Sequence, residues 1–321
     1  MPAVSKNNPD RFGNDSSYGR PGLYLLHRTL LVLVLALLTG GCTFSDALGN
    51  YRNPQGASVA VDPTAAPATI TPAISTPTPT PTEVPCEETT GSVTRISFES
   101  DELQDEFIAS VYTPPCYDPE IGNYPVLYLL HGQSQDNEFW FDLGAAELAD
   151  QAINAGRRPF LIVSPYEADS FAPVSDSLFG SAVVDELIPY IENHYAVCVY
   201  RACRAIGGIS HGGGWAVHIA LLHTDLFSSV GAHSLGFFSG DSYRISRLRK
   251  TLSPDQFPRF YVDRGESDYL KGEQDALDRV LTNYQIPHEY LVSPGSHAES
   301  YWRAHVAGYL AWYMDGWDPQ P

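Results

Sequence analysis

Residues 204–214 have the sequence RAIGGISHGGG, and this stretch decides the fold of the chain. An apolar run leads into Gly-x-Ser-x-Gly at residues 208–212, and small residues that can open a helix follow it. Such a turn brings backbone segments so close together that Cβ atoms beside the serine would collide, which is why glycines flank it. The stretch therefore predicts a strand, a sharp turn and a helix, with Ser210 exposed at the turn as a candidate nucleophile.

Short apolar runs alternate with helical patterns on both sides of this turn. The expected buried strands are Val126–Leu130, Phe160–Ser164, Ala205–Ile209, Ser229–His233, Phe260–Val262 and Tyr290–Val292, and the expected helices are Ser177–Asn193, Gly213–His223, Gly272–Tyr284 and His297–Met314. Residues 92–99 and 106–113 predict an antiparallel hairpin around a turn at 100–103. The order favours the α/β class, with a mostly parallel twisted sheet, helices on both faces and the hairpin at one edge.

A serine nucleophile needs a general base, and His297 is the best candidate. It lies in Pro294-Gly295-Ser296-His297, a turn between a strand and a helix and therefore at the carboxyl end of the sheet, where ligands bind. His288, at a strand start, and His305, inside the last helix, are expected to be structural. His233 ends a strand and is expected to line the pocket.

The base needs a carboxylate to orient it, and three follow the strand Phe260–Val262. Asp268 lies at the far end of the loop, where it can reach across to His297, and is our first choice. Glu266 is the alternative. Asp263 is expected to pair with Arg264 or to cap the turn.

Attack of a serine on a carbonyl creates an oxyanion that two backbone N–H groups usually hold. One is expected from His211, directly after the nucleophile. The second is expected from Gln133, in the loop His131-Gly132-Gln133 after an earlier strand.

Several blocks of this sequence, taken together, resemble the esterase D-like branch of the α/β-hydrolases. They are SVYTPP at 110–115, YPVLYLLHG at 124–132 with Trp140, DELIPY at 185–190, RAIGGIS at 204–210 and PGSH at 294–297 with Tyr301 and Trp302. The blocks occur in order across nearly all of residues 90–315. The resemblance implies an α/β-hydrolase fold and a catalytic triad of Ser210, Asp268 and His297. His211 departs from the family pattern, which usually has an apolar or amide residue after the serine.

The N-terminus predicts export from the cytoplasm. Residues 1–28 carry more basic than acidic residues, Leu30–Leu38 is apolar, and Thr39-Gly40-Gly41 places small residues before Cys42. This order is typical of a secretory signal over residues 1–41, with Cys42 as the lipid-modified first residue of a cell-envelope lipoprotein. The alternative is an uncleaved anchor over Leu23–Leu38. Both place the remaining chain outside the cytoplasm.

Composition separates the rest of the chain into a linker and a globular domain, and it excludes some classes of partner. Residues 42–85 form a linker whose 53–85 segment holds eight Pro and seven Thr and no aromatic residue, which predicts an extended spacer. Residues 86–321 form the globular domain. The net charge of −19 argues against nucleic-acid partners and against charge-driven membrane binding, which leaves an N-terminal lipid as the expected membrane contact.

Four cysteines remain after Cys42, an even number that suits disulfides in an exported chain. The predicted hairpin brings Cys86 and Cys116 to its open end, and Cys198 and Cys203 flank a short turn. We therefore expect the bridges Cys86–Cys116 and Cys198–Cys203. No spacing predicts a metal site.

These observations predict a secreted or surface-tethered serine carboxylesterase that needs no cofactor. Its extracytoplasmic address favours feruloyl or acetyl esters on plant polysaccharide. Two alternatives stay open: an acyltransferase of the mycolyltransferase type, and a non-catalytic surface-binding lipoprotein. Seven aromatic residues are candidates for lining an acyl pocket, although core packing explains most of them equally well: Phe139, Trp140, Phe141, Tyr166, Phe171, Phe237 and Phe238.

Overall fold

The structure is a computed structural model that describes residues 86–318. The predicted signal at 1–41, the candidate lipidation residue Cys42 and the linker at 42–85 lie outside the described residues. Within residues 86–318, no helix is both long and apolar enough to cross a membrane.

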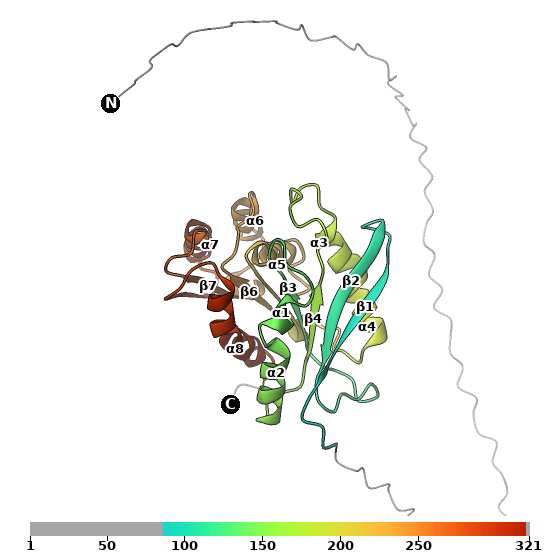
Figure 1. The fold of residues 1–321 in the computed structure, drawn as a ribbon. Helices are drawn as coiled ribbons and strands as arrows, with labels where there is room; N and C mark the ends of the chain where they lie inside the picture. The colour runs from blue at the N-terminus through green and yellow to red at the C-terminus, as the bar shows by residue number, and fades with distance from the viewer. Residues whose placement is uncertain (1–85, 319–321) are drawn as a thin grey trace, which may run out of the picture. The chain divides into compact units, whose positions relative to one another are not determined.

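The described residues form one eight-stranded sheet in the order β1-β2-β4-β3-β5-β6-β7-β8. Strands β1 and β2 lie side by side at one edge of it (Figure 1). Strands β1 and β2 form an antiparallel hairpin, β2 pairs with β4 antiparallel, and every other pair is parallel. The strands are β1 (Ser92–Ser100), β2 (Asp105–Thr113), β3 (Val126–Leu130), β4 (Leu161–Pro165), β5 (Arg204–Ile209), β6 (Ser229–His233), β7 (Arg259–Gly265) and β8 (His288–Ser293). The predicted fold class is confirmed.

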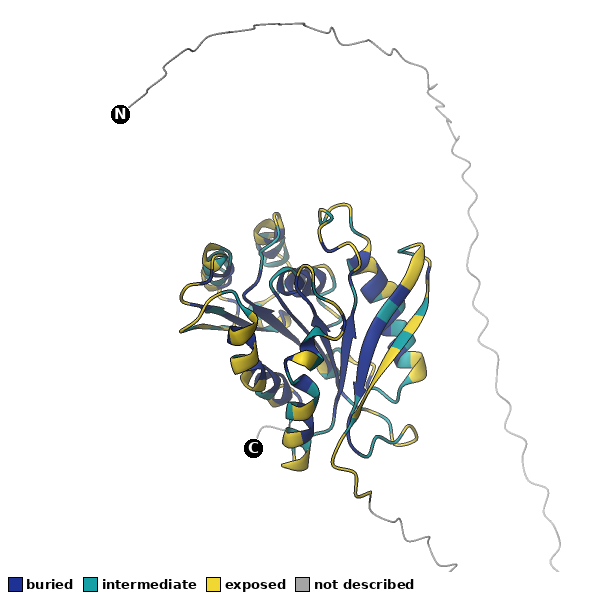
Figure 2. Cartoon of the chain, viewed as in Figure 1, coloured by how far each residue is buried: buried dark blue, intermediate teal, exposed yellow. Residues whose placement is uncertain are grey.

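Helices cover both faces of the sheet, and the core is divided accordingly into two apolar layers (Figure 2). One layer is packed by α3 (Phe179–Ala182), a π-helical turn (Val183–Leu187), α4 (Ile188–His194), α5 (His211–Leu222), α6 (Asp241–Leu248) and α7 (Lys271–Asn283). The other is packed by α1 (Phe139–Asp142), α2 (Ala145–Asn154) and α8 (Glu299–Asp315). Strands β3, β4 and β5 are buried along their whole length, as their continuous apolar runs predict.

The structure departs from the expected elements in three places. The helix expected at 177–193 is interrupted by the π-helical turn, because Pro189 has no N–H to continue the regular bonding pattern. Helices α1, α2 and α6 were not predicted. The hairpin pairs Ser92 with Thr113, whereas a turn centred on 100–103 would have paired Ser92 with Val111.

The hydroxyl of Tyr313, on α8, inserts against strands β5 and β6. A Cβ atom added at Gly207 would lie 1.8 Å from the Tyr313 Oη, and one added at Gly231 would lie 1.7 Å from it. Both positions must therefore be glycine for the last helix to approach the sheet this closely.

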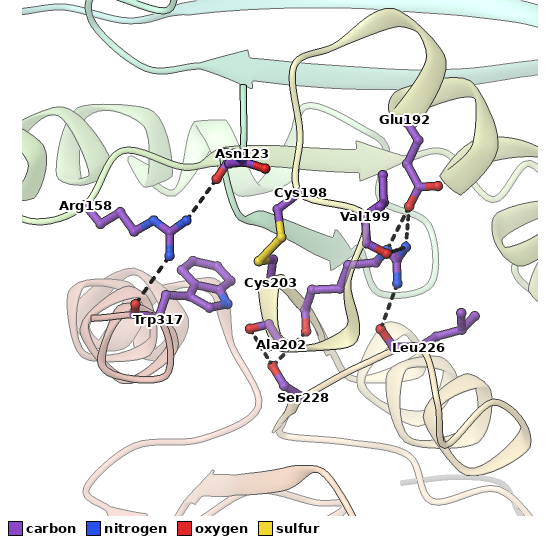
Figure 3. The surroundings of a disulfide bond; sticks show 11 residues. Asn123, Arg158, Glu192, Cys198, Val199, Ala202, Cys203, Leu226, Ser228 and Trp317 are labelled. Atoms are coloured by element: carbon purple, nitrogen blue, oxygen red, sulfur yellow. Dashed lines mark hydrogen bonds and ion pairs between the residues drawn. A yellow bond between two sulfur atoms is a disulfide. The ribbon is translucent and has the colours of Figure 1, made fainter. Parts of the chain in front are cut away.

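Both expected disulfides are present. Cys86–Cys116 joins the start of the domain to the segment after β2, with a Cα–Cα distance of 5.8 Å. Cys198–Cys203 closes the loop before β5 (Figure 3). Next to it, the Arg204 guanidinium donates to the Glu192 carboxylate. These contacts fix the amino end of the strand that carries Ser210 at its other end.

Candidate active site

Ser210 lies at the turn between β5 and α5, with φ 56° and ψ −117°. This is a conformation that a residue with a side chain rarely adopts. A Cβ atom added at Gly208 would lie 2.3 Å from the Gly212 backbone, and one added at Gly212 would lie 2.3 Å from the His131 carbonyl oxygen. The glycines are therefore required by backbone packing around the turn.

The three residues of the predicted triad are joined by hydrogen bonds. His297 Nε2 lies 3.0 Å from Ser210 Oγ. His297 Nδ1 lies 3.0 Å and 3.2 Å from the two carboxylate oxygens of Asp268. The side chains come from the ends of β5, β7 and β8, so the parallel sheet brings together residues from distant parts of the sequence.

Asp268, rather than Glu266, faces the histidine. Asp268 is 1 % exposed, whereas Glu266 is exposed to solvent. Burial raises the pKa of the Asp268 carboxyl, but hydrogen bonds from His297, from the Leu270 N–H and from Ser234 outweigh it, so the pKa lies below its ordinary value. Asp268 is therefore ionised at neutral pH and able to stabilise a positive charge on the imidazole.

Two aromatic rings hold His297 in place. The Trp302 ring meets it edge-on with centroids 5.1 Å apart, and the Tyr269 ring lies 4.5 Å away. The Trp302 indole N–H also donates to Ser234 Oγ at 3.1 Å. Sequence reasoning missed Ser234, although its position just after the strand that neighbours β5 was a usable signal.

The loop after β3 lies against the serine, as expected for an oxyanion site. A Cβ added at Gly132 would lie 3.3 Å from Ser210 Cβ. The Gly132 N–H is already bonded to Gln135 Oε1 at 2.8 Å, whereas the Gln133 N–H has no partner among residues 86–318. The Gln133 side chain is held by the Ser170 carbonyl at 3.0 Å.

The His211 side chain belongs to a buried polar cluster rather than to the solvent. Its Nε2 lies 3.2 Å from Glu167 Oε2, and its side chain is 11 % exposed. The Trp215 indole N–H donates to Glu167 Oε1 and to His211 Nε2, both at 3.0 Å. Sequence reasoning missed Glu167, which follows β4.

The expectations for His233 and Asp263 were wrong. His233 does not line the pocket, and Asp263 does not pair with Arg264. The two residues bond to each other at 2.7 Å, fully buried, because the register of β6 and β7 places them side by side. Arg264 pairs instead with Asp275 at 3.0 Å.

The other candidate histidines have structural partners, as predicted. His288 Nε2 lies 3.1 Å from Asp278, and His305 Nδ1 lies 2.7 Å from the Tyr301 carbonyl oxygen. One group of possible metal ligands occurs among residues 86–318, namely Cys86, Glu88 and Cys116. Both of its sulfur atoms are joined in a disulfide, so the group offers no thiolate.

Comparisons with known proteins identify the family. A family model described as "Putative esterase" matches residues 100–313. The chain is 27 % identical over 226 residues to an endo-1,4-beta-xylanase/feruloyl esterase of Xylanibacter ruminicola, covering 66 % of this chain and 30 % of that protein. It is 26 % identical over 241 residues to esterase Rv1288 of Mycobacterium tuberculosis, covering 59 % and 52 %. The chain thus spans about a third to a half of the length of these curated relatives.

A solved ferulic acid esterase has the same fold, with a TM-score of 0.62 and 23 % identity over 71 % of this chain and 98 % of that one. The family model covers more than half of the chain, and its match contains Ser210, Asp268 and His297. The chain therefore belongs to this esterase family of the α/β-hydrolase fold.

Proposed function

We propose that this protein is an extracytoplasmic serine carboxylesterase that uses Ser210, His297 and Asp268 as its catalytic triad. The observation that carries the proposal is the unbroken hydrogen-bonded chain from Ser210 Oγ through His297 to the Asp268 carboxylate. This is the arrangement by which a weak hydroxyl nucleophile gains a base and the base gains an orienting anion.

In the first step, Ser210 Oγ attacks the ester carbonyl carbon and His297 Nε2 takes the hydroxyl proton. The backbone N–H groups of Gln133 and His211 stabilise the oxyanion. His297 then gives the proton to the leaving alcohol, and the acyl group stays on Ser210. A water molecule, deprotonated by His297, attacks the acyl-enzyme; the acid is released as His297 returns that proton to Ser210 Oγ.

We further propose feruloyl or acetyl esters carried by plant polysaccharide as substrates. The support is the feruloyl esterase named among the relatives, in a protein that also bears a xylanase. The two disulfides support an address outside the cytoplasm, since such bonds persist in oxidising compartments. Lipidation at Cys42 would be tested by lipid labelling of the parent chain and of Cys42→Ser, and equal labelling would contradict it.

A tagged fluorophosphonate tests the activity without assuming a substrate. We expect the full chain, produced where disulfides form, to be labelled, and Ser210→Ala to remain unlabelled while folded. Methyl ferulate, aryl acetates and acetylated xylan would then identify the acyl group. A folded parent chain that takes up no label would refute the proposed function.

A further inference from the structure

A groove of about 690 Å³ lies beside the nucleophile turn and has no role in the mechanism above. Phe237, Phe238 and Ser239 form one wall, from the loop between β6 and α6. Residues 173–175, from the loop after β4, form another, and His218 and Arg244 complete the lining.

The groove is connected to the candidate active site through two contacts. The Gly236 N–H donates to the Ser210 carbonyl oxygen at 2.9 Å. The loop that carries Phe237 and Phe238 is therefore held against the nucleophile turn. The Phe238 ring lies 5.3 Å from that of His211 and 5.8 Å from that of His218. His218 lies eight residues beyond Ser210, which is about 12 Å along α5. A substrate that fills both the groove and the candidate active site must therefore extend well beyond its ester group.

Arg244 gives the groove a positive group with spare hydrogen-bonding capacity. Its Nε forms an ion pair with Asp241 Oδ1 at 3.5 Å, but its guanidinium has no hydrogen bond to any residue in 86–318. The guanidinium carries five donors in a planar fork that matches a carboxylate.

Asp241 contacts both Arg244 and His218 at the base of the groove. It is fully buried, and its Oδ1 lies 2.8 Å from His218 Nδ1. This bond fixes the imidazole and leaves Nε2 without a partner among the described residues.

We propose that this groove is a subsite for a carboxylate-bearing sugar, such as a uronic acid, on the polysaccharide that carries the ester. Arg244 would bind the carboxylate, and Phe237 and Phe238 would contact the apolar face of the ring. The proposal rests on the proposed function. The net charge of the chain is −19, so a preference for an acidic ligand must come from a local positive group.

Direct binding to the full chain carrying Ser210→Ala tests the subsite without turnover. The probes are a xylotriose bearing one glucuronic acid, neutral xylotetraose and free ferulate, measured by calorimetry. We expect the acidic oligosaccharide to bind about tenfold more tightly than the neutral one, the order of one charge-assisted hydrogen bond. Adding Arg244→Met should abolish the preference, and Arg244→Lys should retain part of it.

Arg247→Met is the matched control, because Arg247 lies on the same helix, is exposed and lines no wall of the groove. It should leave the tenfold preference intact. Equal binding of the acidic and neutral oligosaccharides would overturn the subsite, as would a preference that survives Arg244→Met. Arg244-dependent binding of ferulate alone would also overturn it and assign the groove to the released acid.

Different results would refute the subsite and the proposed function. A chain that takes up fluorophosphonate and hydrolyses methyl ferulate but shows no acidic preference refutes the subsite alone. A chain that takes up no fluorophosphonate refutes the esterase, whatever the binding result.

Discussion

His233 and Asp263 form a carboxylate–histidine pair on the strands next to the candidate triad, with 2.7 Å between Nδ1 and Oδ1. Neither side chain is more than 2 % exposed. The Asp263 Oδ2 also accepts hydrogen bonds from Tyr301 at 2.8 Å and from Tyr309 at 2.7 Å. Unlike the His297–Asp268 pair, which reaches the nucleophile, this pair is enclosed in the core.

We expect the enclosed pair to contribute to stability. Asp263→Asn removes the charge that three donors surround and should lower the free energy of unfolding by about 3 kcal/mol. Urea unfolding would measure the loss. Asp101→Asn, at an exposed turn, is the control and should change the free energy by less than about 0.5 kcal/mol. Similar values for both variants would contradict the prediction.

The triad carboxylate should control activity. Asp268→Asn should lower kcat on an aryl ester by about 10⁴-fold, because the imidazole loses the partner that fixes its tautomer and stabilises its charge. Steady-state kinetics would measure it. Glu266→Gln, two residues away and exposed, should leave kcat within about twofold. A large loss in Glu266→Gln with none in Asp268→Asn would reverse the assignment.

Buried tyrosines should make the fold sensitive to alkali. Burial raises the pKa of Tyr301, Tyr309 and Tyr313 well above the ordinary value of 10. Above pH 10 the unfolded chain therefore loses these protons while the folded chain keeps them. The folded state then binds more protons, so stability falls as pH rises, by up to about 1.4 kcal/mol per pH unit for each tyrosine.

Unfolding in urea between pH 9 and pH 11 would measure this slope. Tyr313→Phe removes one of the phenols and should make the slope shallower, whatever it does to stability at pH 8. An unchanged slope would show that Tyr313 ionises alike in both states.

Two glycines should respond to alanine in opposite ways. Gly207→Ala places a Cβ on the Tyr313 hydroxyl and should destabilise by about 2 kcal/mol. Gly308→Ala, on α8 with open space around it, should stabilise by about 0.5–1 kcal/mol through helix propensity. Thermal unfolding would measure both. Tyr313→Phe should reduce the cost of Gly207→Ala, and strict additivity would contradict the proposed clash.

The sequence was informative wherever the chemistry lies within a short stretch of chain. Ser210 is identified by flanking glycines, and His297 and Asp268 by their position after strands, so the structure brings together the three residues expected. The pairing of His233 with Asp263 depends on the register of β6 and β7, and the contact of His211 with Glu167 joins the start of α5 to the loop after β4. Such contacts depend on how the strands are placed relative to one another, which no short sequence pattern predicts.

The positive φ of Ser210 has a consequence for the evolution of the protein. A side chain at φ 56° and ψ −117° costs about 1–3 kcal/mol, which glycine would not incur. Ser210→Gly should therefore raise the unfolding temperature while abolishing labelling by fluorophosphonate. The most direct stabilising substitution at this turn is the one that inactivates it, so a screen for thermal resistance alone would select against activity here.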